Sequence, residues 1–312
     1  CSRRSDRVPG PMSARPARSD TTVAIATILF TVAALSFGDA LIKRASADFL
    51  LWQIFVLRSL LAIPVLVALA LRKGRAGLKA LRVRGVGWVL VRSALLVAMW
   101  VLYYAALPHL KLSIAASAYY TLPIFICLFS AVLLNERVGR LGWAAVAAGF
   151  AGVVLILDPR AGDFNAFVLL PLAAAALYAL AMILTRTKCR YEHPLALSVT
   201  LNVTFVLVGA VGTLWGYLGG EGGGYLAGAW MPMDGSAWGA MAVLAAAILV
   251  GSVGAAIAYQ LGRPSVIASY DFAYVGFAAV WGAMLFGEIP DFQAVAGIAL
   301  IVCAGLLAVR HR

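Results

Sequence analysis

Long apolar runs, separated by short polar segments, make up most of this sequence. The runs span roughly 17 to 25 residues, so each is long enough to cross a hydrocarbon layer about 30 Å thick as an α-helix. Hydrophobic residues form 63% of the chain and charged residues only 12%, whereas an average soluble protein has about 25% charged residues. This pattern predicts an all-α polytopic membrane protein rather than a pair of soluble domains.

The runs predict ten transmembrane helices. Their approximate ranges are 22–42, 50–71, 86–107, 112–134, 141–157, 165–186, 194–217, 238–259, 265–286 and 292–309. Residues 1–20 are rich in Arg, Ser and Pro, so we expect a disordered cytoplasmic tail, in which Met12 is a candidate for the native start. The short connections favour antiparallel neighbours, and the Gly-rich segment 218–237 is expected to be a mobile external loop.

The distribution of basic residues predicts the orientation in the membrane. With the N-terminus in the cytoplasm, the inner segments contain 19 of the 25 Lys and Arg residues and the outer segments contain 4. Basic residues accumulate on the cytoplasmic side of membrane proteins. We therefore predict a multi-pass protein of the bacterial inner (plasma) membrane with both termini cytoplasmic. The net charge of +12 then reflects topology, and we expect no nucleic-acid partner.

One stretch of the first half of the chain recurs in the second half. Residues 113–136 align without a gap on residues 265–288, and seven of the 24 positions are identical. We interpret this as an internal duplication, with a first repeat over 21–158 and a second over 163–312. Five spans in each repeat place the second copy upside down, an inverted-topology arrangement common among secondary transporters. A stable bundle without transport activity is the alternative.

Four charged residues lie within the predicted spans, where charge is costly and indicates function by default. They are Asp39, Arg58, Arg92 and Asp271. The helical rise places Asp39 at a depth similar to that of Arg58 in the outer half, and Arg92 level with Asp271 in the inner half, so each pair could form an ion pair. Structural ion pairs and snorkelling at the interface are the alternatives, above all for Arg92. Asp39 and Asp271 are the candidate proton-linked carboxylates.

Aromatic residues form a second candidate set. Its members are Trp100, Tyr103, Tyr119, Tyr120, Tyr274 and Trp281. Such side chains bind solutes through ring stacking, cation–π contact or hydrogen bonds, although packing and interface anchoring are the common alternatives. Pro123 removes a backbone hydrogen bond within its span and is the predicted hinge. The second copy has Val275 at the matching position, so we expect the two hinges to differ.

The sequence carries no motif for catalysis or for ATP binding. All three histidines lie at or outside the ends of the predicted spans, and no pair of the four cysteines has metal-ligand spacing. Walker A, H-E-x-x-H and G-x-S-x-G motifs are absent from the chain. We therefore expect no enzyme activity, no catalytic residue, no cofactor and no resident metal ion.

The ends of the two halves carry recognisable patterns. P-x-F at 123–125 precedes Leu-Asn-Glu-Arg at 134–137 and a Gly-rich helix at 149–157, while 268–288 leads into GIALIVCAGLL at 297–307. These features, with Arg58 in the second span, resemble the drug/metabolite transporter superfamily, specifically its ten-helix members built from two EamA-type repeats. The resemblance implies a central cavity and proton-coupled or facilitated movement of small organic solutes.

These observations together predict a secondary transporter that exports a small organic metabolite, an amino acid or a related compound, as a monomer or homodimer in the lipid bilayer. The solute would bind between the halves, with protons as the candidate coupling ion. The predicted substrate-binding residues are Arg58, Trp100, Tyr103, Tyr119, Tyr120, Asp271, Tyr274 and Trp281. One alternative is an importer of a nucleotide-like cofactor or vitamin, of the S-adenosylmethionine or riboflavin type. Another is a lipid-handling membrane protein, which would need a lateral opening to the bilayer.

Overall fold

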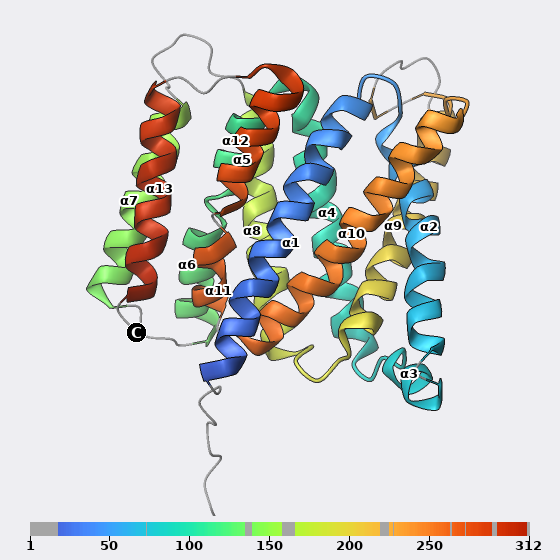
Figure 1. The fold of residues 1–312 in the computed structure, drawn as a ribbon, viewed down its shortest axis with the longest axis horizontal. Coiled ribbons are helices and arrows are strands. Elements are labelled where there is room, and N and C mark those ends of the chain that lie inside the picture. The colour runs from blue at the N-terminus through green and yellow to red at the C-terminus, as the bar shows by residue number, and fades with distance from the viewer. Residues whose placement is uncertain are drawn as a thin grey trace, which may run out of the picture.

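The computed structural model of the chain describes residues 18–72, 74–134, 139–157, 166–218, 225–226, 228–262, 264–271, 273–288 and 292–310. The regular secondary structure of these residues is entirely helical. Figure 1 shows the helices side by side, most of them running between the two ends of the molecule.

The helices of the first half are α1 (Arg18–Ala45), α2 (Leu51–Leu71), α3 (Gly74–Ala80), α4 (Val86–Ala106), α5 (Leu112–Tyr119), α6 (Leu122–Leu134) and α7 (Arg140–Leu157). Those of the second half are α8 (Leu169–Thr187), α9 (Pro194–Leu218), α10 (Gly235–Leu261), α11 (Pro264–Asp271), α12 (Ala273–Phe286) and α13 (Phe292–Arg310). Short 3₁₀ turns, η1 (Leu107–His109) and η2 (Ala166–Val168), follow α4 and precede α8. The helices coincide with the predicted apolar runs, except that α3 forms in a segment expected to be a connection.

Two runs that were predicted as single helices are each broken. The first run divides into α5 and α6, and the second into α11 and α12. At the first break Tyr120 leaves the helical conformation with φ −77° and ψ 15°, and the Thr121 hydroxyl donates a hydrogen bond to the Ala118 carbonyl at 2.9 Å. A side chain that bonds nearby backbone in this way competes with the helical ladder. The matching residue of the second run is Ala273, which has no hydroxyl, so this bond does not account for both breaks.

Pro123 does not lie at the break itself. It is the second residue of α6, where its missing N–H would have no acceptor within the helix. The second copy breaks at the matching place, since α5 ends at Tyr119 and α11 ends at Asp271, 152 residues later, although no proline follows Asp271 before residue 290. The two runs were expected to have different hinges, because only the first contains a proline, yet both helices break at matching positions.

Helices from the two halves of the chain pack against each other in matched pairs. α1 packs on α10 as α8 packs on α4, α1 packs on α12 as α8 packs on α6, and α2 packs on α10 as α9 packs on α4. α2 also packs on α9, and α7 on α13. Figure 1 shows α5 and α12 towards one end of the molecule and α6 and α11 towards the other, so the two broken helices run in opposite directions.

Glycines on α10 allow this helix to approach α1 closely. A Cβ atom added at Gly254 would lie 2.0 Å from the Thr31 Oγ1 atom, and one added at Gly251 would lie 2.3 Å from a methyl group of Leu35. Small residues at helix contacts permit such close approach in membrane proteins. α1 is therefore fixed against α10 along the segment that precedes Asp39.

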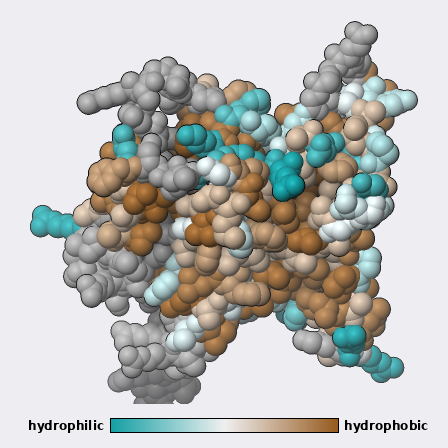
Figure 2. All heavy atoms as spheres, turned by 45° about the horizontal axis from the view of Figure 1, so that its top comes forward, coloured by the Kyte–Doolittle hydropathy of each residue, from teal (hydrophilic) through white to brown (hydrophobic). Residues whose placement is uncertain are grey.

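The outer surface of the bundle is suited to lipid. Seven segments of the described chain are long and apolar enough to cross a membrane. They are Thr22–Ala45, Leu51–Leu71, Val86–His109, Ile114–Leu134, Ala166–Thr187, Pro194–Leu218 and Gly235–Leu261. Figure 2 shows hydrophobic side chains over much of the visible flank, with hydrophilic ones gathered mainly towards the end that comes forward. The chain is thus an all-α polytopic membrane protein.

Candidate functional site

Asp39 lies at the centre of a buried polar cluster, with only 2% of its surface exposed. The Tyr104 hydroxyl donates a hydrogen bond to one carboxylate oxygen of Asp39 at 2.8 Å, and the Tyr274 hydroxyl donates to the other. The Tyr274 and Tyr103 hydroxyls are 3.1 Å apart. Phenols from α4 and α12 therefore satisfy a carboxylate on α1 that would otherwise be costly to bury.

Arg58 lies beside this cluster and is also 2% exposed. Its Nη1 atom lies 3.4 Å from the Tyr104 hydroxyl, to which it donates. The guanidinium carbon lies 4.6 Å from the ring centre of Phe205 and 4.8 Å from that of Phe55, distances at which cation–π attraction operates. Its Nε and Nη2 atoms have no hydrogen-bond partner among the described residues.

The predicted ion pair between Arg58 and Asp39 is not formed. No contact within 4.0 Å joins their charged groups, and Tyr104 instead connects them by accepting from Arg58 and donating to Asp39. The two side chains belong to one cluster but are separated by a phenol. Tyr104 therefore couples the cation to the carboxylate.

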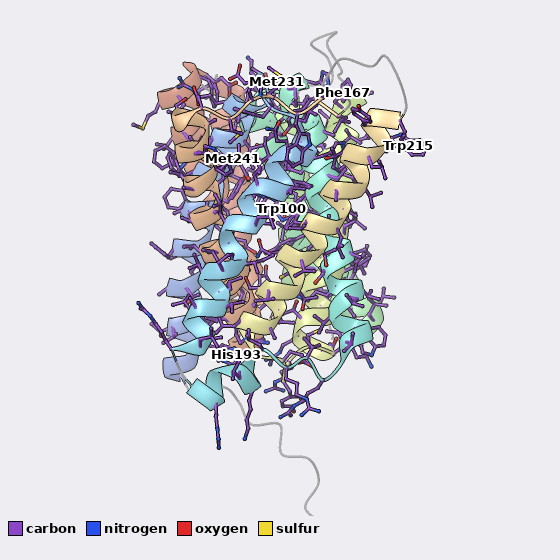
Figure 3. All side chains as sticks on the ribbon, turned by 90° about the vertical axis from the view of Figure 1, so that its right-hand side faces the viewer. Trp100, Phe167, His193, Trp215, Met231 and Met241 are labelled. Carbon is purple, nitrogen blue, oxygen red and sulfur yellow. The ribbon has the colours of Figure 1, made fainter. Side chains whose placement is uncertain are left out.

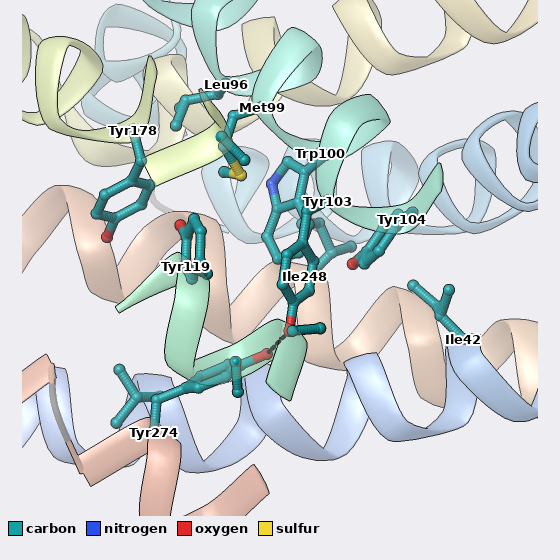
Figure 4. Close-up of a cluster of buried hydrophobic side chains, with 14 of the residues drawn as sticks. Ile42, Leu96, Met99, Trp100, Tyr103, Tyr104, Tyr119, Tyr178, Ile248 and Tyr274 are labelled. Atoms are coloured by element: carbon teal, nitrogen blue, oxygen red, sulfur yellow. Dashed lines mark hydrogen bonds between the residues drawn. The ribbon is translucent and has the colours of Figure 1, made fainter. Parts of the chain in front are cut away.

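Aromatic rings fill the space around these charges. Figure 4 shows Trp100, Tyr103 and Tyr104 on α4 next to Tyr119 and Tyr274. The measured ring-centre separations are 5.1 Å for Tyr103 and Tyr119, 4.8 Å for Trp100 and Tyr104, 6.5 Å for Tyr119 and Tyr274, and 4.9 Å for the stacked pair Tyr120 and Tyr274. Figure 3 places Trp100 near mid-height in the bundle, so the cluster lies far from both ends.

Asp271 reaches the cluster through two tyrosines that the sequence prediction missed. The Tyr259 hydroxyl donates to the Asp271 carboxylate. The Tyr259 ring lies 6.2 Å from that of Tyr178, which lies 5.9 Å from that of Tyr119. A tyrosine within an apolar run is the only sequence signal that could have identified Tyr178 and Tyr259.

Trp281 lies outside this chain of tyrosine contacts. Its ring packs 4.9 Å from that of Phe37, and its Nε1 atom has no hydrogen-bond partner among the described residues. Of the predicted aromatic set, the structure therefore brings together Trp100 and the tyrosines, whereas Trp281 borders α1. The side chain of the predicted hinge, Pro123, lies outside the described residues.

The sequence suggested that Arg92 either pairs with Asp271 or snorkels to the membrane surface, and the structure shows neither arrangement. No ion pair within 4.0 Å joins it to Asp271; instead its Nε atom donates to the Thr185 hydroxyl at 2.6 Å. Because it is only 1% exposed, it does not snorkel to the membrane surface either. Within the described part of the chain, Arg92 is therefore a buried cation hydrogen-bonded to a neutral side chain, that of Thr185.

Comparison with known proteins assigns this chain to a family. Residues 22–158 match the EamA-like transporter family. The chain is 30% identical over 227 residues to a riboflavin transporter of Rhizobium johnstonii, covering 71% of this chain and 68% of that protein. The chain belongs to the EamA-like transporter family. This EamA-like transporter is thus a bacterial, multi-pass inner-membrane protein of the drug/metabolite transporter superfamily, and its family indicates a transporter rather than an enzyme.

Further comparisons agree with this assignment. The transporter is 26% identical over 280 residues to a pseudopaline exporter of Pseudomonas aeruginosa, covering 89% of this chain and 93% of the exporter. A solved crystal structure superposes with a TM-score of 0.71 at 21% identity, covering 94% of this chain and 98% of that one. At that identity the likeness shows the shared fold alone.

Polar contacts tie together each end of the transporter. At the end where α1 finishes, the Lys43 Nζ atom lies 2.5 Å from a Glu288 carboxylate oxygen and donates to the Leu110 carbonyl at 3.1 Å. The other Glu288 oxygen accepts from the Leu112 N–H at 3.0 Å. At the opposite end, where Figure 3 shows His193, the Glu192 carboxylate accepts from the N–H of Gly85 at 2.7 Å. The buried cluster therefore lies between two tied ends.

Cys189 and Asp234, in connections between the helices, have pKa values shifted by their surroundings. Burial raises the pKa of the Cys189 thiol, and Arg92 only partly offsets this effect. Hydrogen bonds from the Ala237 N–H and the Ser236 hydroxyl lower the pKa of Asp234, which caps the N-terminus of α10. At neutral pH the thiol is therefore protonated and the cap is ionised.

Proposed function

We propose that this EamA-like transporter is a secondary active exporter of a small organic metabolite, an amino acid or a related compound. The proposal rests on one observation above all: a buried cluster in which Asp39 and Arg58 are held by tyrosines, midway between the tied ends. A polar site enclosed in this way must be exposed to each side in turn, which is alternating access. Both termini would be cytoplasmic, in keeping with the distribution of basic residues.

The moving parts would be two inverted five-helix repeats, at 21–158 and 163–312, giving ten transmembrane spans. The matched helix pairings support this division, because exchanging the repeats reproduces the same contacts. The opposite directions of the two broken helices support it as well. Inverted repeats commonly place the substrate site near the midplane, on discontinuous helices, and Tyr119 and Asp271 are the residues at which α5 and α11 end.

Arg58 and the aromatic rings indicate the chemistry of the solute. The unpartnered Nε and Nη2 atoms of Arg58 are suited to a carboxylate or another anionic group, which arginine binds in a bidentate manner. The phenol and indole rings supply apolar faces and hydroxyl groups. Trp100, Tyr103, Tyr119, Tyr120 and Tyr274 would contact the body of the solute, and Trp281 would border the site.

Asp39 is the better candidate for proton coupling than Asp271. Its two phenol partners come from different repeats, Tyr104 from the first and Tyr274 from the second, whereas Tyr259, the partner of Asp271, lies in the same repeat as Asp271. Protonating Asp39 would therefore weaken a contact between the moving parts. Pro123, next to the break between α5 and α6, would act as a hinge.

Import of a vitamin or nucleotide-like cofactor is the second candidate function. It is favoured by the aromatic content of the cluster and by the relative from Rhizobium johnstonii, a riboflavin transporter. The likeness to a pseudopaline exporter favours the outward direction. A lipid-handling role has less support, since Asp39 and Arg58 are each only 2% exposed rather than open to the bilayer.

The test begins with a thermal-shift screen of the purified protein against amino acids, riboflavin and S-adenosylmethionine, because a ligand stabilises the fold according to its occupancy. Flux of the stabilising compound is then measured in vesicles under an imposed pH gradient. Arg58→Ala, Tyr119→Ala and Asp39→Asn should each reduce flux at least tenfold, whereas Trp215→Ala, at a side chain 80% exposed on the flank, should not. Wild-type flux in the three site variants would refute the proposal.

A further inference from the structure

Arg92 is a buried cation that the cluster around Asp39 leaves unexplained. Its Nε atom donates to the neutral Thr185 hydroxyl, and its Nη1 atom has no hydrogen-bond partner within the described part of the chain. A buried charge without an opposite charge or a full set of hydrogen bonds is costly. Such a group persists in a membrane protein when it serves a ligand or a pathway.

None of the nearby acidic groups neutralises Arg92. Asp271 accepts from Tyr259 and forms no ion pair with Arg92. The Glu192 carboxylate is occupied by the backbone N–H groups of Arg84 and Gly85. Burial raises the pKa of the Cys189 thiol, so this group carries no charge at neutral pH. Among the described residues, no acidic group therefore completes this site.

The helix that carries Arg92 also leads to the first arginine. Residues 92, 96, 99 and 103 of α4 recur at the spacing of one helical face, and all four are buried. Arg92 and Tyr104 are twelve residues apart, which corresponds to about 18 Å along the helix, and Tyr104 is the residue that contacts Arg58. Two cations with unpartnered N–H groups therefore lie at either end of the same buried stretch of α4.

Aromatic side chains connect these two positions. Figure 4 shows Leu96, Met99, Trp100 and Tyr103 in succession along α4, with Tyr119 and Tyr178 opposite them. Tyr178 lies 5.9 Å from Tyr119, measured between ring centres, and it lies two turns before Thr185, the partner of Arg92, on α8. The route from Arg58 to Arg92 is thus lined mainly by aromatic rings, and the two carboxylates beside it, Asp39 and Asp271, each accept hydrogen bonds from tyrosine hydroxyls.

We propose that Arg92, oriented by Thr185, is a second anion-binding site, at which the carboxylate or other anionic oxygen group of the solute is held at the opposite end of the aromatic cluster from Arg58. The inference rests on the proposed transport function and extends it to a class of solute, one that combines an anionic group with an apolar or aromatic body. The two arginines would hold the anionic group in turn as the solute crosses.

The test is equilibrium binding of radiolabelled phenylacetate to the full-length protein in lipid nanodiscs. Wild-type protein should bind two equivalents, and the neutral phenylacetamide should not compete. Arg92→Gln should bind one equivalent, with affinity at the second site lowered about tenfold or more, since it loses charge-assisted hydrogen bonds. Thr185→Val should keep two equivalents but weaken the same site. Arg84→Gln, at an exposed side chain near the same end, is the matched control and should behave as wild type.

The outcomes separate this inference from the proposed function. Two equivalents bound with unchanged affinity by Arg92→Gln, or fewer than two by the wild type, would overturn the second site. If Arg58→Gln loses one equivalent and Arg92→Gln loses none, the proposed function stands and this inference is refuted. If Arg92→Gln loses one equivalent and Arg58→Gln loses none, the second site stands and the proposed role of Arg58 is refuted. If Arg92→Gln fails to elute as a folded protein, Arg92→Lys, which keeps the charge but not the planar fork, should show the weakened site.

Discussion

Replacing Glu288 with glutamine should open the end of the bundle at which α1, α5 and α12 meet. Glu288 contacts Lys43 on α1 at 2.5 Å and accepts from the Leu112 N–H at 3.0 Å. It therefore ties the end of α12 both to α1 and to the start of α5. Glutamine keeps the size of the side chain and one acceptor oxygen but removes the charge, so the change acts on the ion pair itself.

The size of the effect follows from the partial burial of the pair. Fully exposed ion pairs contribute about 0.2–1 kcal/mol, and hydrogen bonds to charged groups contribute about 1.5–3 kcal/mol. The Lys43 and Glu288 side chains are 14% and 16% exposed, so solvent screens them only in part. We expect a loss of about 1–2 kcal/mol, which corresponds to about a 5- to 30-fold change in the population open at this end.

Cysteine labelling measures that population. Ala116 on α5 is completely buried, so Ala116→Cys, in a background without the four native cysteines, reacts only when this end opens. A membrane-impermeant thiol reagent applied from the Lys43 side should label the Glu288→Gln variant about 5- to 30-fold faster than its parent. Glu192→Gln, which loosens the opposite end, is the matched control and should not accelerate labelling.

A double-mutant cycle with Lys43→Met provides the decisive comparison. If the ion pair holds this end closed, the double variant should label about as fast as Glu288→Gln alone, because the two substitutions remove the same interaction. A change of less than twofold in Glu288→Gln, or effects of the two substitutions that simply add, would refute the reasoning.

Two further predictions concern α10. Gly254→Ala should lower the free energy of unfolding by about 1–3 kcal/mol, the usual cost of overpacking, because the new Cβ atom would lie 2.0 Å from Thr31 Oγ1. Gly239→Ala should instead raise the free energy of unfolding by about 0.5–1 kcal/mol, because no atom lies within 4 Å of its new Cβ atom. Thermal unfolding in detergent would test both. Because hydrogen bonding lowers the pKa of Asp234, its cap contributes stability above the unfolded-state pKa, and this is lost as pH falls through the folded-state pKa. Amide exchange at Ala237 should accelerate over that range in the wild type but not in Asp234→Asn, and equal acceleration in both would contradict it.

The helices were predictable because the bilayer fixes their length. A span of about 20 apolar residues is visible in the sequence without knowledge of any contact, and the structure contains helices at each predicted run. The break at Tyr120 was not predictable in the same way. Apolar residues continue through it, and the hydrogen bond from the Thr121 hydroxyl to the Ala118 carbonyl beside it is visible only in the structure.

The charges show a second limit of the sequence. The expected depth of a residue in the membrane follows from the rise of 1.5 Å per residue, and this is why Asp39 and Arg58 were expected to lie near each other. The direction in which a side chain points around its helix depends on how the helices pack, and this decides the partner. Arg92 consequently meets Thr185 rather than Asp271, and Tyr104 separates Arg58 from Asp39.

The proposed duplication would explain the arrangement of the helices but not the buried cluster. Shifted by 152 residues, Tyr103 and Tyr104 of α4 align with Ala255 and Ala256 of α10. The large phenols of α4 reach Asp39 and Tyr274, whereas the small residues of α10, such as Gly254, let α1 pack closely. α4 therefore supplies the partners of the buried charges, and α10 fixes the helix that carries Asp39. Exchanging Tyr104 and Ala256 should thus disrupt both roles at once, because neither helix could replace the other.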